Sequence, residues 1–208
     1  MEKKKIIINI GRQLGSGGRI IAKKLADDFG CTLYDKELLN LAAKESGFCE
    51  KFFEQNDEKK GFLKSLFHMH TPHLGDDNLY CCKFSQESLF QFQSDAILKA
   101  ASEGSCVFVG RCADYVLRNH KNAVNIFITA DIEQRAKVVS ERHGCDIAAA
   151  KKIIAEKEDV RSSYYNYYTG KKWGHSTSYD LCVNTSLLGF ENTGKLLKEF
   201  IKMRFGLE

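Results

Sequence analysis

The stretch IIINIGRQLGSGGRIIAKKLADDFG, residues 6–30, contains three patterns in succession. Residues 6–10 form a short β-branched run of the kind that makes a buried strand. Four glycines then fall within eight residues, and apolar residues recur at helical spacing as far as Gly30, a residue type that often ends a helix. The stretch therefore predicts a strand, a glycine-rich loop and a helix, in that order.

The rest of the chain continues this alternation. Further strands are predicted at residues 32–34, 106–109, 124–128 and 181–184, and helices at residues 35–42, 85–100, 131–143, 146–161 and 191–205. Such alternation implies a parallel sheet covered on both faces. We therefore predict one α/β domain over residues 1–208, with three layers and about five parallel strands. Residues 46–84 follow no clear period and are predicted to be an irregular insertion.

The composition excludes several classes of protein. With 43% hydrophobic and 28% charged residues, the chain has the composition of a folded domain. Its net charge of +4 fits a small anionic ligand and falls short of the basic stripe expected of a nucleic-acid binder. No stretch approaches the ~20 apolar residues that cross a bilayer. We therefore expect a cytoplasmic protein without a membrane span, in which the eight scattered cysteines are reduced thiols.

The glycine-rich loop, residues 11–19, is predicted to lie at the carboxyl edge of the sheet, where parallel sheets bind ligands. Its glycines let backbone N–H groups turn toward an anion, and the following helix adds its N-terminal dipole. The loop departs from the Walker pattern G-x-x-x-x-G-K-[ST], since Arg12, Gly18 and Arg19 replace the first glycine, the lysine and the hydroxyl residue. Arg12 or Arg19 could supply the missing charge, and we favour Arg19, whose side chain could curl back to the phosphates. The alternative is a tight structural turn with two solvated arginines.

Four other arginines are candidates for phosphate contacts. Arg135 and Arg142 are seven residues apart and share a helix face, and Arg161 lies near the end of the next helix. Spacing alone leaves two interpretations equally supported: a lid that closes over phosphates, or solvated charges, as expected for the charged residues 151–159. Arg111 follows a predicted strand, where it would meet a ligand or pair with Asp114.

Two further clusters have simpler explanations. The tyrosines and tryptophan of residues 164–174 could stack on a base, but such clusters more often pack a helix onto the core. The histidines of residues 68–73, with Cys81 and Cys82 downstream, match no standard zinc spacing, so we predict a solvated loop and no metal site.

Taken together, the sequence resembles the cytidylate-kinase-like family, a branch of the nucleoside monophosphate kinases. The resemblance is carried by residues 11–22, 33–38, 109–111, 129–135 and 164–186. It implies a P-loop-type fold with a parallel sheet, a monophosphate-binding region and an arginine-bearing helical lid, here residues 142–174. Residues 48–84 match the family least.

The resemblance also assigns roles to single residues. The donor phosphates of ATP would be bound by Gly15, Ser16, Gly17 and Gly18, to which our interpretation of the loop adds Arg12. The acceptor nucleotide would be bound by Asp35 and Arg111, and we add Asp114, two residues after the position of the family's aspartate. The catalytic charges would be Arg135, Arg142 and Arg161, with Arg19 added as the substitute for the Walker lysine. Cys112 stands where the family has an aspartate, so cytosine selectivity does not follow from this element.

Three functions remain in consideration. The first is an enzyme that transfers the γ-phosphoryl group of ATP, with Mg²⁺, to a small-molecule nucleotide acceptor, cytidylate being the first to test. The second is a sensor or partner module that binds a nucleotide or phosphate without transfer, because the Walker lysine is missing. The third, a nucleic-acid binder, rests only on the basic charge and the tyrosines. The sequence predicts no oligomeric state.

Overall fold

The computed structural model describes residues 5–35 and 86–207. The chain divides into two units, residues 1–36 with 97–208 and residues 37–96. All the elements discussed below belong to the first unit, except the first part of one helix, α5. The predicted helix at 35–42, the insertion at 46–84 and the histidines of residues 68–73 lie outside the described residues.

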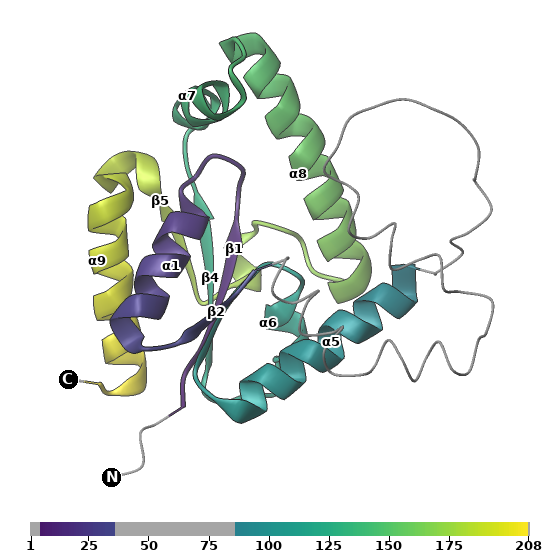
Figure 1. The fold of residues 1–208 in the computed structure, drawn as a ribbon, viewed down its shortest axis with the longest axis vertical. Coiled ribbons are helices and arrows are strands. Elements are labelled where there is room, and N and C mark those ends of the chain that lie inside the picture. Colours follow the sequence, from purple (N-terminus) through teal and green to yellow (C-terminus); the bar gives the residue numbers. More distant parts are fainter. Residues whose placement is uncertain (1–4, 36–85, 208) are drawn as a thin grey trace. The chain divides into compact units, whose positions relative to one another are not determined.

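The sheet of the first unit has five strands in the order β2-β3-β1-β4-β5 (Figure 1). The strands are β1 (Ile7–Arg12), β2 (Thr32–Tyr34), β3 (Cys106–Val109), β4 (Ala123–Thr129) and β5 (Leu181–Asn184). All four pairings between neighbours are parallel. The predicted parallel α/β fold is therefore confirmed. Because β1 lies between β3 and β4, the glycine-rich loop that follows it emerges at the centre of the carboxyl edge.

The helices are α1 (Gly18–Phe29), α5 (Gln86–Glu103), α6 (Ala113–Val116), α7 (Ile132–His143), α8 (Ile147–Thr169) and α9 (Thr185–Phe205), with a short 3₁₀ helix, η1 (Ser176–Ser178). Helices α1 and α9 pack together on one side of the sheet, and α6 lies on the other (Figure 1). The main core combines strand residues such as Ile8 and Ile126 with Leu25 of α1 and Leu197 of α9, all of which are fully buried.

Two helices differ from the sequence prediction. Helix α8 continues past Arg161 to Thr169, where Gly170 takes a left-handed conformation with φ 66°. The tyrosines that we placed after this helix belong to its last turns, where the rings of Tyr164 and Tyr168 pack 4.7 Å apart. Helix α9 begins at Thr185 rather than at residue 191, with a break at Gly189.

Within residues 5–35 and 86–207, no helix combines the length and the apolar character that a membrane span requires.

Candidate active site

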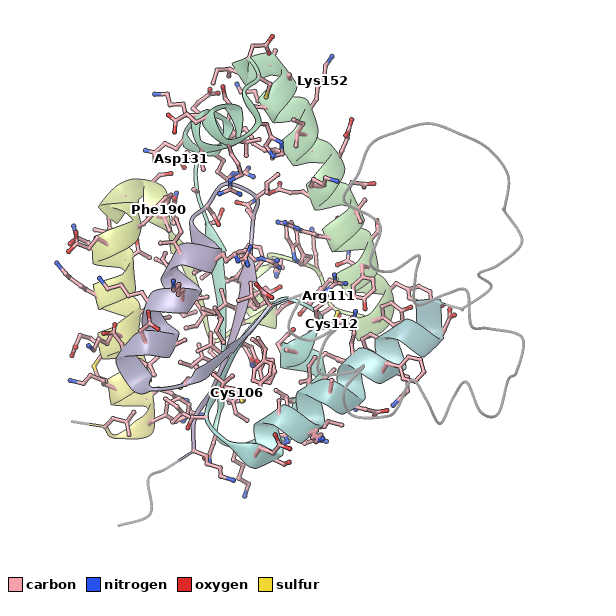
Figure 2. The ribbon with its side chains drawn as sticks, in the orientation of Figure 1. Cys106, Arg111, Cys112, Asp131, Lys152 and Phe190 are labelled. Carbon is pink, nitrogen blue, oxygen red and sulfur yellow. The ribbon has the colours of Figure 1, made fainter. Side chains whose placement is uncertain are left out.

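The glycine-rich loop has the backbone conformation that its glycines allow. Gly15 and Gly17 have φ values of 82° and 76°, in the left-handed region that other residues rarely adopt. A Cβ atom at Gly15 would lie 2.7 Å from the carbonyl oxygen of Arg135, and one at Gly17 would lie 2.5 Å from Cδ1 of Phe190. Both positions thus need glycine for conformation and for space. Figure 2 shows Phe190 on α9, close to the start of α1.

The amides of the loop are available to an anion. The N–H groups of residues 15–18 donate to no acceptor in the described part of the chain. The two preceding amides are held, Gln13 by the carbonyl of Ile128 at 3.0 Å and Leu14 by Oε1 of Glu158 at 3.2 Å. The four amides lie at the N-terminus of the twelve-residue helix α1, an arrangement that suits a phosphate.

Ser16 contributes its backbone but not its hydroxyl to this surface. The side chain is fully buried. Its hydroxyl lies 2.9 Å from the carbonyl oxygen of Gln13 and 3.1 Å from that of Ile128. The carbonyl of Ser16 in turn accepts a hydrogen bond from Thr185 at 3.1 Å. These contacts fasten the loop to β4 and α9, so the hydroxyl faces the protein interior.

Arg12 crosses from the loop to the end of β3. A Cβ atom at Gly18 would lie 2.6 Å from Cβ of Arg12, so the stem of the arginine passes over Gly18. A Cβ atom at Gly110 would collide with Nη1 of Arg12, so the guanidinium lies against Gly110. Nη1 of Arg161 lies 3.5 Å from the carbonyl oxygen of Arg12, which brings α8 to the same place.

The site carries an excess of positive charge. Burial, together with repulsion from Arg161, Arg111 and Arg19, lowers the pKa of Arg12 to about 9, and Asp35 opposes this effect. Burial also lowers the pKa of Arg161, with Arg111 adding to the effect and Glu158 opposing it. Three other arginines and Asp35 therefore lie close enough to Arg12 to affect its charge, and an anionic ligand would relieve the repulsion among the four guanidinium groups.

The backbone after β3 is unusual. Gly110, Arg111 and Cys112 have φ values of 77°, 61° and 56°, so two residues with side chains adopt the left-handed conformation in succession. Such conformations cost free energy and cluster at functional sites. The turn places the guanidinium carbon of Arg111 5.9 Å from the ring centroid of Tyr164 on α8. Figure 2 shows Arg111 and Cys112 together at this end of the sheet. Burial raises the pKa of the Cys112 thiol to about 12, which keeps it neutral.

Asp35 and Arg19 form an ion pair. Nη2 of Arg19 lies 2.6 Å from Oδ2 of Asp35, which follows β2 and is buried. The side chain of Arg19 remains 67% exposed. The guanidinium thus reaches toward Asp35, whereas the sequence had led us to expect that it curls back over the loop. The direction of this side chain is set by the nearby carboxylate.

Asp114 is part of a buried contact between two helices. Its carboxylate is buried and accepts a hydrogen bond of 2.7 Å from the hydroxyl of Tyr165. Burial raises the pKa of Asp114. The contact joins α6 to α8, and the predicted alternative of a surface pair with Arg111 is not what the structure shows.

Arg135 and Arg142 occupy different environments. Arg135 is buried, with Nε donating to the carbonyl of Ala130 at 2.9 Å and Nη1 paired with Oε1 of Glu158 at 2.5 Å. The same Glu158 oxygen accepts the N–H of Leu14, so Arg135 connects α7, α8 and the loop. Arg142 is exposed in the last turn of α7. Seven residues correspond to about 10 Å along a helix, which carries Arg142 beyond the point where the loop packs.

The structure therefore brings together only part of the predicted site. Arg19, Arg111, Arg161 and Asp35 lie near Arg12, whose side chain passes over Gly18 of the loop. Glu158 was not predicted to belong to the site, because its sequence context is that of the solvated charges of residues 151–159. No local signal distinguishes it, because its partner Arg135 lies 23 residues away on another helix.

Comparison with known proteins identifies a family and relatives along most of the chain. The cytidylate kinase-like family matches the chain over residues 7–187. A protein named cytidylate kinase from Pyrococcus horikoshii is 28% identical over 203 residues, 97% of this chain and 91% of that protein. A cytidylate kinase from Methanopyrus kandleri is 25% identical over 94% of this chain and 93% of its own length.

Solved structures support the same fold. An uncharacterised protein from Eubacterium ventriosum superimposes with a TM-score of 0.72 at 29% identity, covering 95% of this chain and 99% of that one. A shikimate kinase from Bacteroides thetaiotaomicron, 10% identical, gives a TM-score of 0.52 over 95% of this chain and 98% of its own. The latter similarity establishes a P-loop kinase-like fold and nothing more specific.

Proposed function

Because the chain belongs to the cytidylate kinase-like family, we propose that it transfers the γ-phosphoryl group of ATP to a nucleoside monophosphate, cytidylate being the first acceptor to test. The observation that carries the proposal is the group of four arginines beside four loop amides. Phosphoryl transfer requires mainly positioning and neutralisation of charge, and a group of cations around an amide-lined loop supplies both.

The loop and the arginines would divide the substrate between them. The N–H groups of residues 15–18 would hold the donor phosphates, as amides at a helix N-terminus do. Arg12, Arg111 and Arg161 would neutralise the charge between donor and acceptor. Asp35 repels phosphate, so we assign it to a hydroxyl or amino group of the acceptor nucleoside, with Arg19 fixing its orientation.

Two buried contacts would position this machinery without touching substrate. Glu158 holds both Arg135 and the N–H of Leu14, next to the phosphate-binding amides. Tyr165 and Asp114 fasten the other half of α8. We propose that residues 142–174 act as a lid whose closed position these contacts maintain, and that Arg142 could approach the substrates only through a movement of α7 and α8.

The described residues of the loop offer poor ligands for Mg²⁺, which usually accompanies ATP. Arg19 replaces the Walker hydroxyl residue, and the Ser16 hydroxyl is turned inward. Among residues 5–35 and 86–207, no group of three acidic, histidine or cysteine side chains could hold a metal ion. Neither Arg19 nor the Ser16 hydroxyl can take the place of the Walker hydroxyl as a ligand, and we propose that the ion enters with ATP, bound by phosphates and water.

An ATP-consumption screen over nucleoside monophosphates, with Mg²⁺ present, tests the proposal. Turnover with one acceptor well above the rate with water supports it. The main alternative, a phosphate-binding sensor or partner module, is motivated by the missing Walker lysine at Gly18. ATP binding without turnover for every monophosphate would favour that alternative.

A further inference from the structure

We propose that the replacements at positions 12 and 18 of the loop are one coupled exchange, in which Arg12 takes over the space and the charge of the missing Walker lysine. The inference rests on the proposed function for its catalytic part. Its binding part concerns a phosphoanhydride, such as that of ADP or inorganic pyrophosphate, and can be tested without any transfer.

The coupling is steric. A Cβ atom at Gly18 would lie 2.6 Å from Cβ of Arg12 and 2.9 Å from its Cγ. The Cβ atoms of residues 12 and 18 are both fixed by the backbone, so a change of rotamer cannot separate them. A side chain at position 12 therefore excludes one at position 18, and the reverse. The Walker pattern obeys the same constraint, since its first glycine accompanies the lysine at the second position.

The guanidinium of Arg12 lies in the region that the Walker lysine would occupy, but its side chain begins on the opposite side of the loop. The stem of Arg12 covers Gly18, where the lysine side chain would begin, and the guanidinium reaches Gly110 at the end of β3. It thus lies between the phosphate-binding amides that follow β1 and the acceptor-side turn at Arg111. A cation in this position can contact the phosphoryl group that passes between them, and a guanidinium can do so with two hydrogen bonds.

The competing candidate is oriented elsewhere. Arg19 directs its guanidinium to Asp35 at 2.6 Å and is 67% exposed. Arg12 is instead enclosed by Arg161 and Arg111, whose charges repel it. A bound polyphosphate would replace this repulsion with attraction, whereas Arg19 would first have to leave its carboxylate.

The test exchanges the two residues singly and together. The variants are Arg12→Met, which keeps the stem but removes the charge, Gly18→Lys, and the double variant Arg12→Gly/Gly18→Lys, which restores the first glycine and the lysine of the Walker pattern. Lys23→Ala, which removes an exposed charge from α1, is the matched control. Each protein is examined by thermal melting, by calorimetric titration with ADP, and by turnover with any acceptor that the wild type uses.

Arg12→Met should melt no lower than the wild type, bind ADP at least about 10-fold more weakly, and lose about 10²-fold in turnover, the scale of one preorganised charge. Gly18→Lys should have a lower melting temperature than the wild type and should not bind ADP. The double variant should recover both the melting temperature and the ADP affinity. Wild-type ADP affinity in Arg12→Met, or a double variant no better than Gly18→Lys, would overturn the proposal. A wild type that phosphorylates no acceptor, with the ADP results as expected, refutes the transfer function and leaves Arg12 as the phosphate-binding cation.

Discussion

Removal of the Arg135 guanidinium should destabilise the fold rather than only impair chemistry. The side chain of Arg135 is 8% exposed and that of Glu158 is 18% exposed. In Arg135→Met, the carboxylate of Glu158 would keep the N–H of Leu14 and the nearby charge of Arg161 but lose its ion-pair partner, and breaking a buried pair in this way costs about 3–5 kcal/mol. In a chain of this size 1 kcal/mol shifts the Tm by about 2–4 °C, so the Tm should fall by about 6–20 °C.

The double variant separates pairing from burial. Arg135→Met/Glu158→Met removes both charges, and apolar replacements of a buried pair are often tolerated. The remaining cost should come from the Leu14 amide, which loses its acceptor, and the Ala130 carbonyl, which loses its donor in both variants, about 1–3 kcal/mol each. The double variant should therefore melt above Arg135→Met. Differential scanning calorimetry measures all three proteins.

The same two helices provide a control. Lys151 of α8 and Glu133 of α7 form an ion pair at 2.7 Å whose side chains are 41% and 65% exposed. Exposed pairs contribute about 0–1 kcal/mol, so Lys151→Met should hardly change the Tm. If Arg135→Met melts no lower than Lys151→Met but loses turnover, the structural role assigned to Arg135 is wrong, and the catalytic role suggested by the sequence is the better explanation.

Three further predictions concern the loop, the proposed lid and the arginine cluster. Gly17→Val should abolish ADP binding in calorimetry, because the position has φ 76° and a Cβ atom would lie 2.5 Å from Phe190; an unchanged affinity would contradict the assigned loop. ATP with an acceptor should slow hydrogen exchange in residues 142–174, and identical protection with and without ligands would count against a lid. The pKa of Arg12 is lowered to about 9, so its cation is present below that pH and lost above it. ADP affinity should consequently fall between pH 8 and about 10 in the wild type. Arg12→Met should show a shallower fall, and equal slopes would exclude Arg12 as the titrating group.

The strands could be predicted from sequence because their signals are local. Residues 32–34, 106–109 and 181–184 are short apolar or β-branched runs, and each is a strand in the structure. The order of strands along the chain then placed Arg12 and Arg111 at the carboxyl edge of the sheet. The end of α8 was missed because its last turns are covered by tyrosines rather than by a regular apolar stripe.

The directions of charged side chains could not be predicted, because they depend on partners from other elements. Arg19 was expected over the loop, but Asp35, 16 residues away, holds it. Glu158 was expected in solvent, but the amide of Leu14, 144 residues away, binds it. In both cases the residue type is also that of an ordinary solvated charge. Only the folded structure shows that the side chain is paired with a distant residue.

Positions 12 and 18 are sterically coupled, and a comparison with the Walker motif position by position does not reveal this coupling. Taken separately, an arginine for glycine and a glycine for lysine each remove something that a phosphate loop needs. In the folded loop a Cβ atom at position 18 would lie only 2.6 Å from that of residue 12, so a side chain at one position requires glycine at the other. The positive charge of the loop is then conserved while its origin moves from the start of α1 to the end of β1. A loop without the Walker lysine need not have lost its cation, and whether it has depends on which side chain fills the space above residue 18.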